Sequence, residues 1–434
     1  MTLYPTESGG GADANRADPT DADPTDADPT DADPTDGVPP LCLAVAAYDE
    51  PLAEELLNAG ADPLRPLDGV PGGDPVLPGG DTPLTRAVDS GCSWMTTRLL
   101  PEPVRLDADA RAALLARARH WADADLEAEL RRRTGAAGPV ERRTVRVDGW
   151  SCHHERYTLA GQTVWDGHLG VLTALEERFR IRTPFDELLA RALTRPDRDH
   201  AVWTDVVVHL ATRQDDETWT AAEALRDHPD RLRRLFAADV LRCLVIGFGG
   251  LFARPGAVVD KPATEVFLPW AVQERDPEVL AVVLSGLSEA DGDGVDGTRA
   301  DEIDAVGLSY VGHPDPRVRL EVPETLRRAA ESVPAEKLDA LYTLTRDPDA
   351  GVRERAAYWL ASCRAQAPGI TDVLAALLDD ELRETRVHAA YGLAKRGDPR
   401  CVEAGRRLLP LDPDGWPDAN LVRAMWAYEK GDDG

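Results

Sequence analysis

The chain has 434 residues, 43% of them hydrophobic, and its 78 Asp and Glu outnumber 49 Lys and Arg to give a formal net charge of −29. Nucleic-acid-binding proteins neutralise phosphates with clustered Lys and Arg, so this acidity argues against DNA or RNA as the ligand. No apolar run approaches the roughly 18 residues that span a bilayer and the first residues resemble no signal peptide, so we expect a cytoplasmic protein without a membrane partner.

The first 38 residues are strongly acidic and of low complexity. Ala-Asp-Pro-Thr-Asp occurs four times in tandem between Ala17 and Asp36. Proline at every fifth position prevents a helix, the carboxylates repel one another, and little is present that could form a core. The sequence predicts a disordered, extended acidic tail over residues 1–38.

Residues 39–138 contain two segments that resemble ankyrin repeats, one over 40–62 and one over 81–100. The resemblance rests on a Thr-Pro-Leu turn at residues 82–84, on a helix that ends at Gly91, and on Gly60-Ala61-Asp62. Glycine at such positions adopts backbone conformations that other residues resist. Tyr48 stands where the first repeat would have glycine. The resemblance implies two stacked helical pairs at this end of the chain.

The rest of this region is predicted as a loop and a capping helix. Residues 67–80 are rich in Gly and Pro and lengthen the connection between the two ankyrin-like segments. One helix is expected over 107–133, and the cations Arg131, Arg132 and Arg133 at its end complement the helix dipole. We prefer that structural role for the three arginines to a phosphate site.

Residues 139–182 connect the two repeat regions. Alternating side chains over 141–149 and 155–161 predict a small β-hairpin, which would be the only sheet of the protein. Residues 167–176 are expected to form the helix that follows it.

The best candidates for chemistry lie in this segment, at Cys152, His153, His154 and, further on, His168. Zinc binds thiolate and imidazole ligands that converge tetrahedrally, and this set could supply three of them. Adjacent side chains on an extended strand point to opposite faces, however, and no second ligand pair stands at a recognised spacing. We therefore interpret the cluster as a polar hairpin tip, and we expect no metal and no cofactor.

The C-terminal half contains a repeat in register, with residues 347–361 matching residues 380–394, 33 positions later. A period of 20 to 50 residues is typical of stacked supersecondary units. Each copy begins with an acidic helix cap and continues with Val, Ala-Ala and Leu on one helical face. Residues 313–319 and, more faintly, 228–234 match the same pattern. The motif resembles the HEAT family, which implies an α-solenoid of helical pairs over 183–434.

The HEAT resemblance also implies a ladder of hydrogen bonds between Asp and the Arg six residues later, across successive repeats. In this sequence the pairs would be Asp347 with Arg353 and Asp380 with Arg386. His313 replaces the leading Asp of its copy and interrupts the pattern. These four residues are predicted to be structural.

Other residues that invite a functional reading have structural interpretations. The six cysteines are scattered and read as free, buried thiols of a reducing compartment. Four tryptophans in helical apolar patterns are expected in the core: Trp203, Trp219, Trp359 and Trp426. The acidic loop 291–297 lacks the Gly and the ligand that a calcium loop needs at its turn, so we expect a plain loop.

We therefore expect a mostly α, non-enzymatic scaffold or adaptor that binds a protein or peptide, including one of basic character. Exposed polar positions on the second helices, such as Glu354, Arg355 and His388, are the predicted contact residues, and no catalytic residue is predicted. Two alternatives stay open: an inhibitor or immunity-type protein that covers a basic partner, and a helical-repeat enzyme such as a HEAT-type lyase or a DNA glycosylase.

Overall fold

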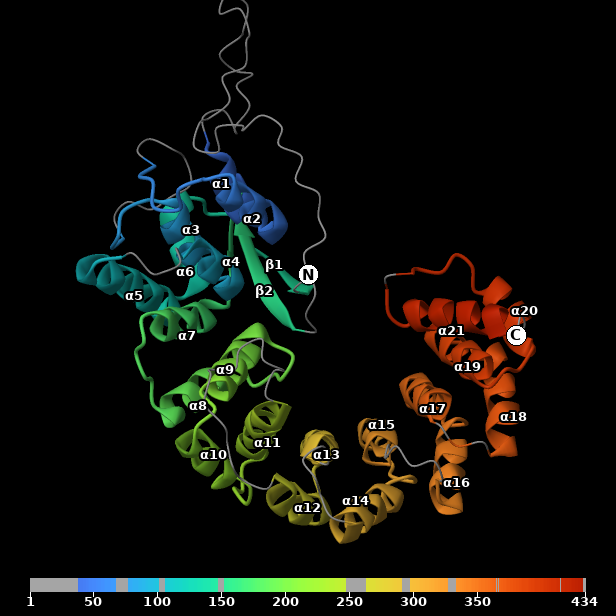
Figure 1. The fold of residues 1–434 in the computed structure, drawn as a ribbon. Helices are drawn as coiled ribbons and strands as arrows, with labels where there is room; N and C mark the ends of the chain where they lie inside the picture. The colour runs from blue at the N-terminus through green and yellow to red at the C-terminus, as the bar shows by residue number, and fades with distance from the viewer. Residues whose placement is uncertain are drawn as a thin grey trace, which may run out of the picture. The chain divides into compact units, whose positions relative to one another are not determined.

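The computed structural model describes residues 38–67, 77–100, 106–146, 152–246, 263–290, 297–326, 333–363, 365, 367–413 and 415–431. Their contacts divide the chain into two compact units, residues 1–210 and 211–434 (Figure 1). Both are built mainly of helices, which confirms the expected mostly α fold. The predicted tail, apart from Val38, and the loop at 291–296 lie outside the described residues. Among the described residues, no helix has the length and hydrophobicity needed to cross a bilayer.

The first unit contains nine of the described helices, the last of which continues into the second unit. They are α1 (Pro40–Ala47), α2 (Glu50–Asn58), α3 (Pro83–Ser90), α4 (Ser93–Leu99), α5 (Ala108–Asp123), α6 (Leu126–Thr134), α7 (His168–Arg178), α8 (Phe185–Leu193) and α9 (Ala201–Thr212).

Helix boundaries in the first unit follow from local chemistry. Thr82 and Thr85 form a reciprocal cap at the start of α3, because each side-chain oxygen accepts the other residue's backbone N–H. Gly91 ends α3 at a φ of +78°, and a Cβ there would lie 2.1 Å from the carbonyl oxygen of Trp165. Tyr48 adopts the same left-handed conformation at the end of α1, with a φ of +57°. The likeness of these helix pairs to ankyrin repeats stays a prediction.

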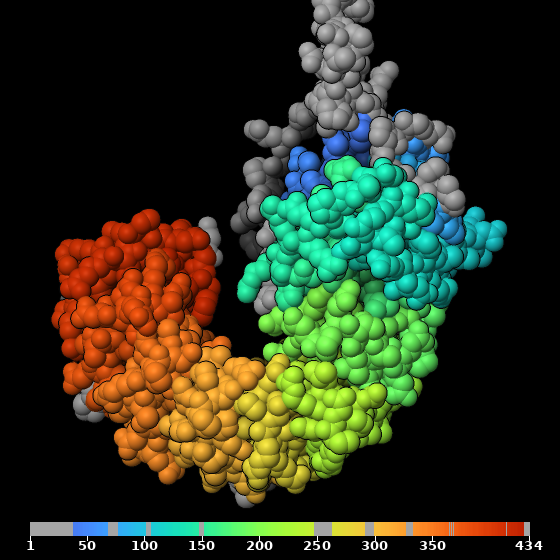
Figure 2. All heavy atoms as spheres, turned by 180° about the vertical axis from the view of Figure 1, so that it is seen from behind, coloured from blue at the N-terminus to red at the C-terminus, as the bar shows by residue number. Residues whose placement is uncertain are grey.

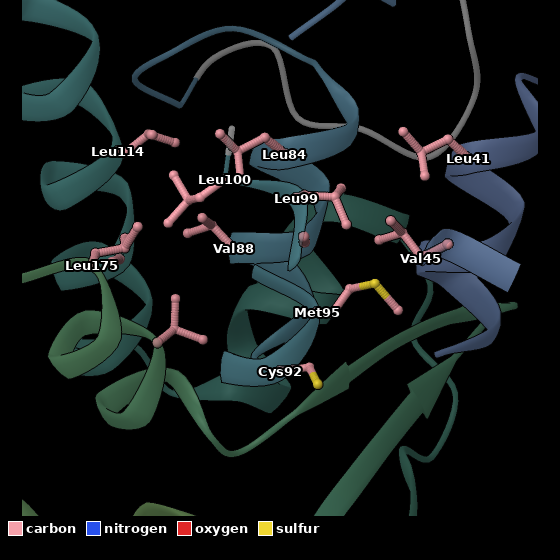
Figure 3. Close-up of a cluster of buried hydrophobic side chains, with 14 of the residues drawn as sticks. Leu41, Val45, Leu84, Val88, Cys92, Met95, Leu99, Leu100, Leu114 and Leu175 are labelled. Atoms are coloured by element: carbon pink, nitrogen blue, oxygen red, sulfur yellow. The ribbon is translucent and has the colours of Figure 1, made fainter. Parts of the chain in front are cut away.

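The core of the first unit lies between its helix pairs and α7. Side chains from α1, α3, α4, α5 and α7 meet there, with Met95 and Leu99 between Val45 and Val88 (Figure 3). One correction concerns the predicted helix over 107–133, which is two helices. Asp125 interrupts it, because its carboxylate accepts the N–H of Ala128 and starts α6 as a new helix.

The predicted hairpin is present as part of a three-stranded antiparallel sheet. Its strands are β1 (Glu141–Arg146), β2 (His153–Leu159) and β3 (Gln162–Trp165), in the order β1-β2-β3. The pairing of Glu141 with Thr158 sets the register of β1 on β2. A tight turn through Ala160 and Gly161, both at positive φ, leads into β3, which sequence reasoning missed. Helix α7 follows where a helix was expected.

The second unit is a series of helical pairs. After α10 (Asp216–Glu223), the first helices of the pairs are α12 (Ala263–Gln273), α14 (Gly297–Ser309), α16 (Ala335–Leu344), α18 (Pro368–Ala376) and α20 (Arg400–Arg407). The second helices are α11 (Arg231–Ile246), α13 (Pro277–Ala290), α15 (Pro316–Thr325), α17 (Ala350–Ser362), α19 (Arg383–Lys395) and α21 (Asp418–Gly431).

Each second helix packs against the second helices before and after it in the sequence. The pairs therefore follow one another along this unit in chain order, as the colour bands from yellow to red show (Figure 2). Small residues bring neighbouring helices close together: a Cβ on Gly392 of α19 would lie 2.8 Å from Cα of Ala361 on α17. This packing matches the expected solenoid.

The predictions for cysteine and tryptophan are confirmed in part, since Cys363 and Trp359 are only partly buried and Trp426 is exposed. All six cysteines are free thiols and all but Cys363 are buried. Trp203 and Trp219 are each 1% exposed, whereas Trp426 on α21 is 61% exposed. The prediction for Trp426 is wrong because α21, unlike the second helices before it, has no described second helix after it in the sequence to cover that side.

Candidate functional site

The arginine ladder of the second unit is present, but its pairing differs from the prediction. The carboxylate of Asp347 accepts hydrogen bonds from Arg319 of the preceding repeat, at 2.7 and 2.8 Å. Arg353 in turn reaches Asp380 of the following repeat, with Nε 2.8 Å from Oδ2. Arg353 contacts Asp347 only through its backbone carbonyl, at 2.9 Å. Arg319 and Arg353 therefore each donate to a backbone carbonyl in the loop of their own repeat and to the carboxylate of the next repeat.

The other two arginines of the series differ from each other. Arg234 pairs with Glu274 in the same way, whereas Arg386 donates to the carbonyl oxygen of Asp380 at 2.7 Å and forms no ion pair among the described residues. The ladder is interrupted between α13 and α15, where Leu280 stands in place of the arginine and His313 in place of the acid. Both members of that pair are replaced together, so neither leaves a charge without its partner.

The predicted contact residues lie on adjacent second helices, and all three engage one another or a neighbour. Arg355 pairs with Glu324 of α15 at 2.7 Å. Glu354 accepts a hydrogen bond from Nε2 of His388 on α19 at 2.8 Å. Glu354 and Arg355 are partly exposed, but His388 is buried. The prediction that His388 is exposed is therefore wrong, because aromatic rings cover it.

Those rings form an aromatic patch, made of Tyr358, His388 and Trp416. The three ring centroids lie 5.2 to 6.0 Å apart, with tilted or edge-on geometry. Trp416, just before α21, is 63% exposed. Sequence reasoning missed Trp416 because it lies outside the repeated motif, in a short loop that only the folded chain places beside α17 and α19.

The metal candidates of the first unit separate in the fold. Cys152 lies near Asp205, and burial raises the pKa of its thiol. His153 faces Asp197 at 3.3 Å. His168 donates from Nε2 to the backbone oxygen of Asp89 at 3.0 Å and stacks on Trp121, and burial lowers its pKa to about 4.

Only His154 joins other metal-ligand side chains, namely Asp166 and His200. All three are buried, and one donor atom of each lies within 4.8 Å of the others. His200 Nε2 is 3.0 Å from Asp166 Oδ1, and His154 Nδ1 is 3.7 Å from the same oxygen. Burial by itself would raise the pKa of Asp166, but the two imidazoles hold it well below its usual range. Asp166 and His200 carry no motif that the sequence alone could have singled out.

The hydrogen bonds of this cluster do not fit a bound metal. Val202 N–H donates to Nδ1 of His200, so Nε2 carries the proton and donates it to Asp166. A metal would need the lone pair of that same Nε2. Asp166 also accepts the N–H of Glu155 and pairs with Arg195, 2.9 and 3.0 Å away. Through these contacts Asp166, which follows β3, instead connects the strands β2 and β3 to the start of α9.

A second buried network surrounds Asp89 at the end of α3. Its carboxylate accepts hydrogen bonds from Arg117, Trp121 and Arg133 at 2.6 to 2.9 Å. Arg133 also pairs with Glu129 and lies over the Trp121 ring, 4.4 Å from the centroid. This arrangement supports the structural role predicted for the arginines at the end of α6.

Comparison with known proteins agrees with the geometry of the second unit. The family model for HEAT repeats matches residues 338–425, which include both copies of the 33-residue motif. Helices α17 to α20 lie within this match, which supports the HEAT resemblance predicted from the sequence for that part of the chain.

Other comparisons add little to this result. No curated protein matches the chain. One similar solved structure is an X-ray structure of the YibA protein of Escherichia coli, which is 17% identical and has a TM-score of 0.42. The alignment covers 57% of this chain and 93% of that one. A similarity of this size does not bear on function.

Proposed function

We propose that this protein is a non-catalytic scaffold or adaptor, and that the aromatic patch on its second helices is the centre of a protein-binding surface. The observation that carries the proposal is the exposure of Trp416. Trp416 is 63% exposed, and its ring packs against the rings of Tyr358 and His388. A ring that neighbouring rings already confine loses less side-chain entropy when a partner covers it.

The composition around the patch supports the same function. Trp, Tyr and Arg are the residues that most often dominate binding energy at protein interfaces. Trp416 and Tyr358 belong to the patch, and Arg355 lies one helical turn from Tyr358 on α17. Stacked helical repeats also present extended surfaces that recognise proteins or peptides. Glu354 pairs with His388 of the patch, and Glu324 pairs with Arg355. Together with the net charge of −29, they favour a partner with basic side chains.

The chain offers a matched pair of variants that tests this surface. Trp416→Ala removes the patch ring, and Trp426→Ala removes an equally exposed tryptophan on α21. We expect the wild type and Trp426→Ala to capture the same proteins from the source cell, and Trp416→Ala to fail to capture them. Equal capture by all three would sink the proposal. Matching thermal unfolding of the two variants ensures that loss of capture reflects the surface rather than the fold.

An inhibitor or immunity-type protein would use the same surface, and the salt dependence of binding separates the two uses. A partner held mainly by charge dissociates as salt rises from 50 to 500 mM, because exposed charges are screened over roughly 10 Å at 0.1 M. A partner seated mainly on Trp416 is retained.

A further inference from the structure

Strand β1 forms one edge of the sheet in the first unit. It pairs with β2 on one side only, and its residues are almost all exposed. No other described segment forms a backbone hydrogen bond to residues 141–146. The outward N–H and C=O groups of a six-residue strand are therefore available to a further strand.

This edge is basic in a protein that is otherwise strongly acidic. Arg142 and Arg143 are 58% and 64% exposed, and Arg146 is exposed as well. Arg142 and Arg146 share one face of β1 with Thr144, because side chains alternate along a strand. Arg142 also pairs with Glu127, whereas the structure shows no ion pair for Arg146 among the described residues.

The register of the sheet brings two like charges together on the other face. Arg143 lies directly opposite Arg156 of β2. Like charges in directly opposed positions destabilise a strand pair, and Glu141 beside Arg143 offsets only part of this repulsion. This face of β1 therefore also keeps an excess of positive charge.

Charges on an edge strand also have a protective role, since they discourage pairing between copies of a protein. Antiparallel pairing of β1 with β1 of a second copy would bring the arginines of both strands together. The same charges that exclude a second copy would attract a strand of opposite charge. The occupant that fits this edge is thus acidic and extended.

We propose that β1 accepts an extended acidic segment of a partner protein as a fourth strand of the sheet. Its backbone would pair with the free edge, and its carboxylates would lie beside Arg142 and Arg146. Small apolar side chains on its opposite face would lie beside Val145. This surface belongs to the first unit and is independent of the patch around Trp416.

A synthetic peptide tests the proposal on the full chain. The probe is a fluorescein-labelled octapeptide in which Asp alternates with Val, titrated by fluorescence anisotropy. Replacing Asp by Lys is expected to weaken binding at least about tenfold. Methylating alternate backbone nitrogens, in both possible patterns, is expected to weaken it by about tenfold or more in one pattern, because it removes the paired N–H groups and keeps the charge.

Two protein variants and one further measurement complete the test. Arg146→Glu is expected to weaken binding by about tenfold, whereas Arg406→Glu on α20, an equal charge change at an exposed site, leaves it unchanged within about twofold. Hydrogen exchange of residues 141–146 should slow when the peptide is bound. Binding that is insensitive to both methylation patterns, or unchanged exchange in β1, would overturn strand addition in favour of simple charge attraction.

Discussion

Asp205 on α9 has a carboxyl group whose surroundings disfavour its charged form. Its Oδ2 is buried close to Ser93 and Gly170 and has no hydrogen-bond partner among the described residues. Burial raises the pKa of its carboxyl to about 7. An acid with a raised pKa in the folded state keeps its proton there while the unfolded chain loses it, so folding stability falls as pH rises from about 4 to about 7.

We therefore expect Asp205→Asn to stabilise the first unit at pH 8 and to have little effect at pH 4. The gain is at most about 4 kcal/mol, from roughly three pKa units at 1.36 kcal/mol each. Urea unfolding at the two pH values measures it. Asp186→Asn, an exposed change of the same kind on α8, should alter stability by less than about 1 kcal/mol at either pH. A loss of stability for Asp205→Asn at pH 8 would contradict the account.

Among these single residues, the sequence predicted only the directions in which the side chains of the Cys152–His154 segment point. The alternation of a strand predicts that Cys152, His153 and His154 diverge, and they do, toward three different surroundings. The partners that give His154 its surroundings, Asp166 and His200, lie 12 and 46 positions later in the chain. Only tertiary packing brings them together, so no spacing rule could have identified them.

Among the elements, the arginine ladder makes a direct prediction. Arg353→Gln removes the charged fork that joins Asp380 to the loop at Asp347, and it should lower the free energy of unfolding of the second unit by about 1 to 3 kcal/mol. Arg346→Gln, a neighbouring exposed arginine that bonds only to the carbonyl of Tyr342, is the control. Denaturant unfolding that ranks the control as the more damaging change would be inconsistent with the ladder.

The interrupted position of the ladder provides a second test. His313→Asp should change stability by less than about 0.5 kcal/mol, because Leu280 leaves no arginine for the new carboxylate. Asp347→His should destabilise by more than about 1 kcal/mol, because Arg319 then loses its partner. Thermal unfolding of both variants compares the two positions. Equal effects would mean that the leading residue acts only as a local cap.

Element types were well predicted where the pattern was strong, and pairings were not. The alanine face predicted α17 and α19, and the Asp-Pro start predicted α17, because both signals are local, although Asp349 rather than Asp347 caps that helix. The same motif could not show that Arg353 binds the acid of the next repeat, since both acids stand at the same position in identical motifs. Asp125 shows that a local signal can also be missed. Within a helical pattern, a polar residue that caps a new helix cannot be distinguished by sequence from a polar residue on the exposed face of one continuous helix.

For the whole molecule, the division at residue 210 predicts that a substitution in one unit changes the stability of that unit and not of the other. Hydrogen exchange in the double variant Asp205→Asn with Arg353→Gln should be slower in the first unit and faster in the second, each by the amount seen in the single variants. Pulse-labelling mass spectrometry resolves the two regions. Coupling larger than about 0.5 kcal/mol between the substitutions would indicate that the units unfold together.

The direction of the arginine ladder has an evolutionary consequence. Arg234, Arg319 and Arg353 each reach forward, from their own helix to the acid that opens the next repeat. A stretch of DNA that encodes one period therefore carries one donor and one acceptor, whichever residue it begins with. Such a stretch could be duplicated or lost without leaving a mismatched pair at either junction. The match between residues 347–361 and 380–394, which are identical at 7 of 15 positions, is the trace that a gain of this kind would leave.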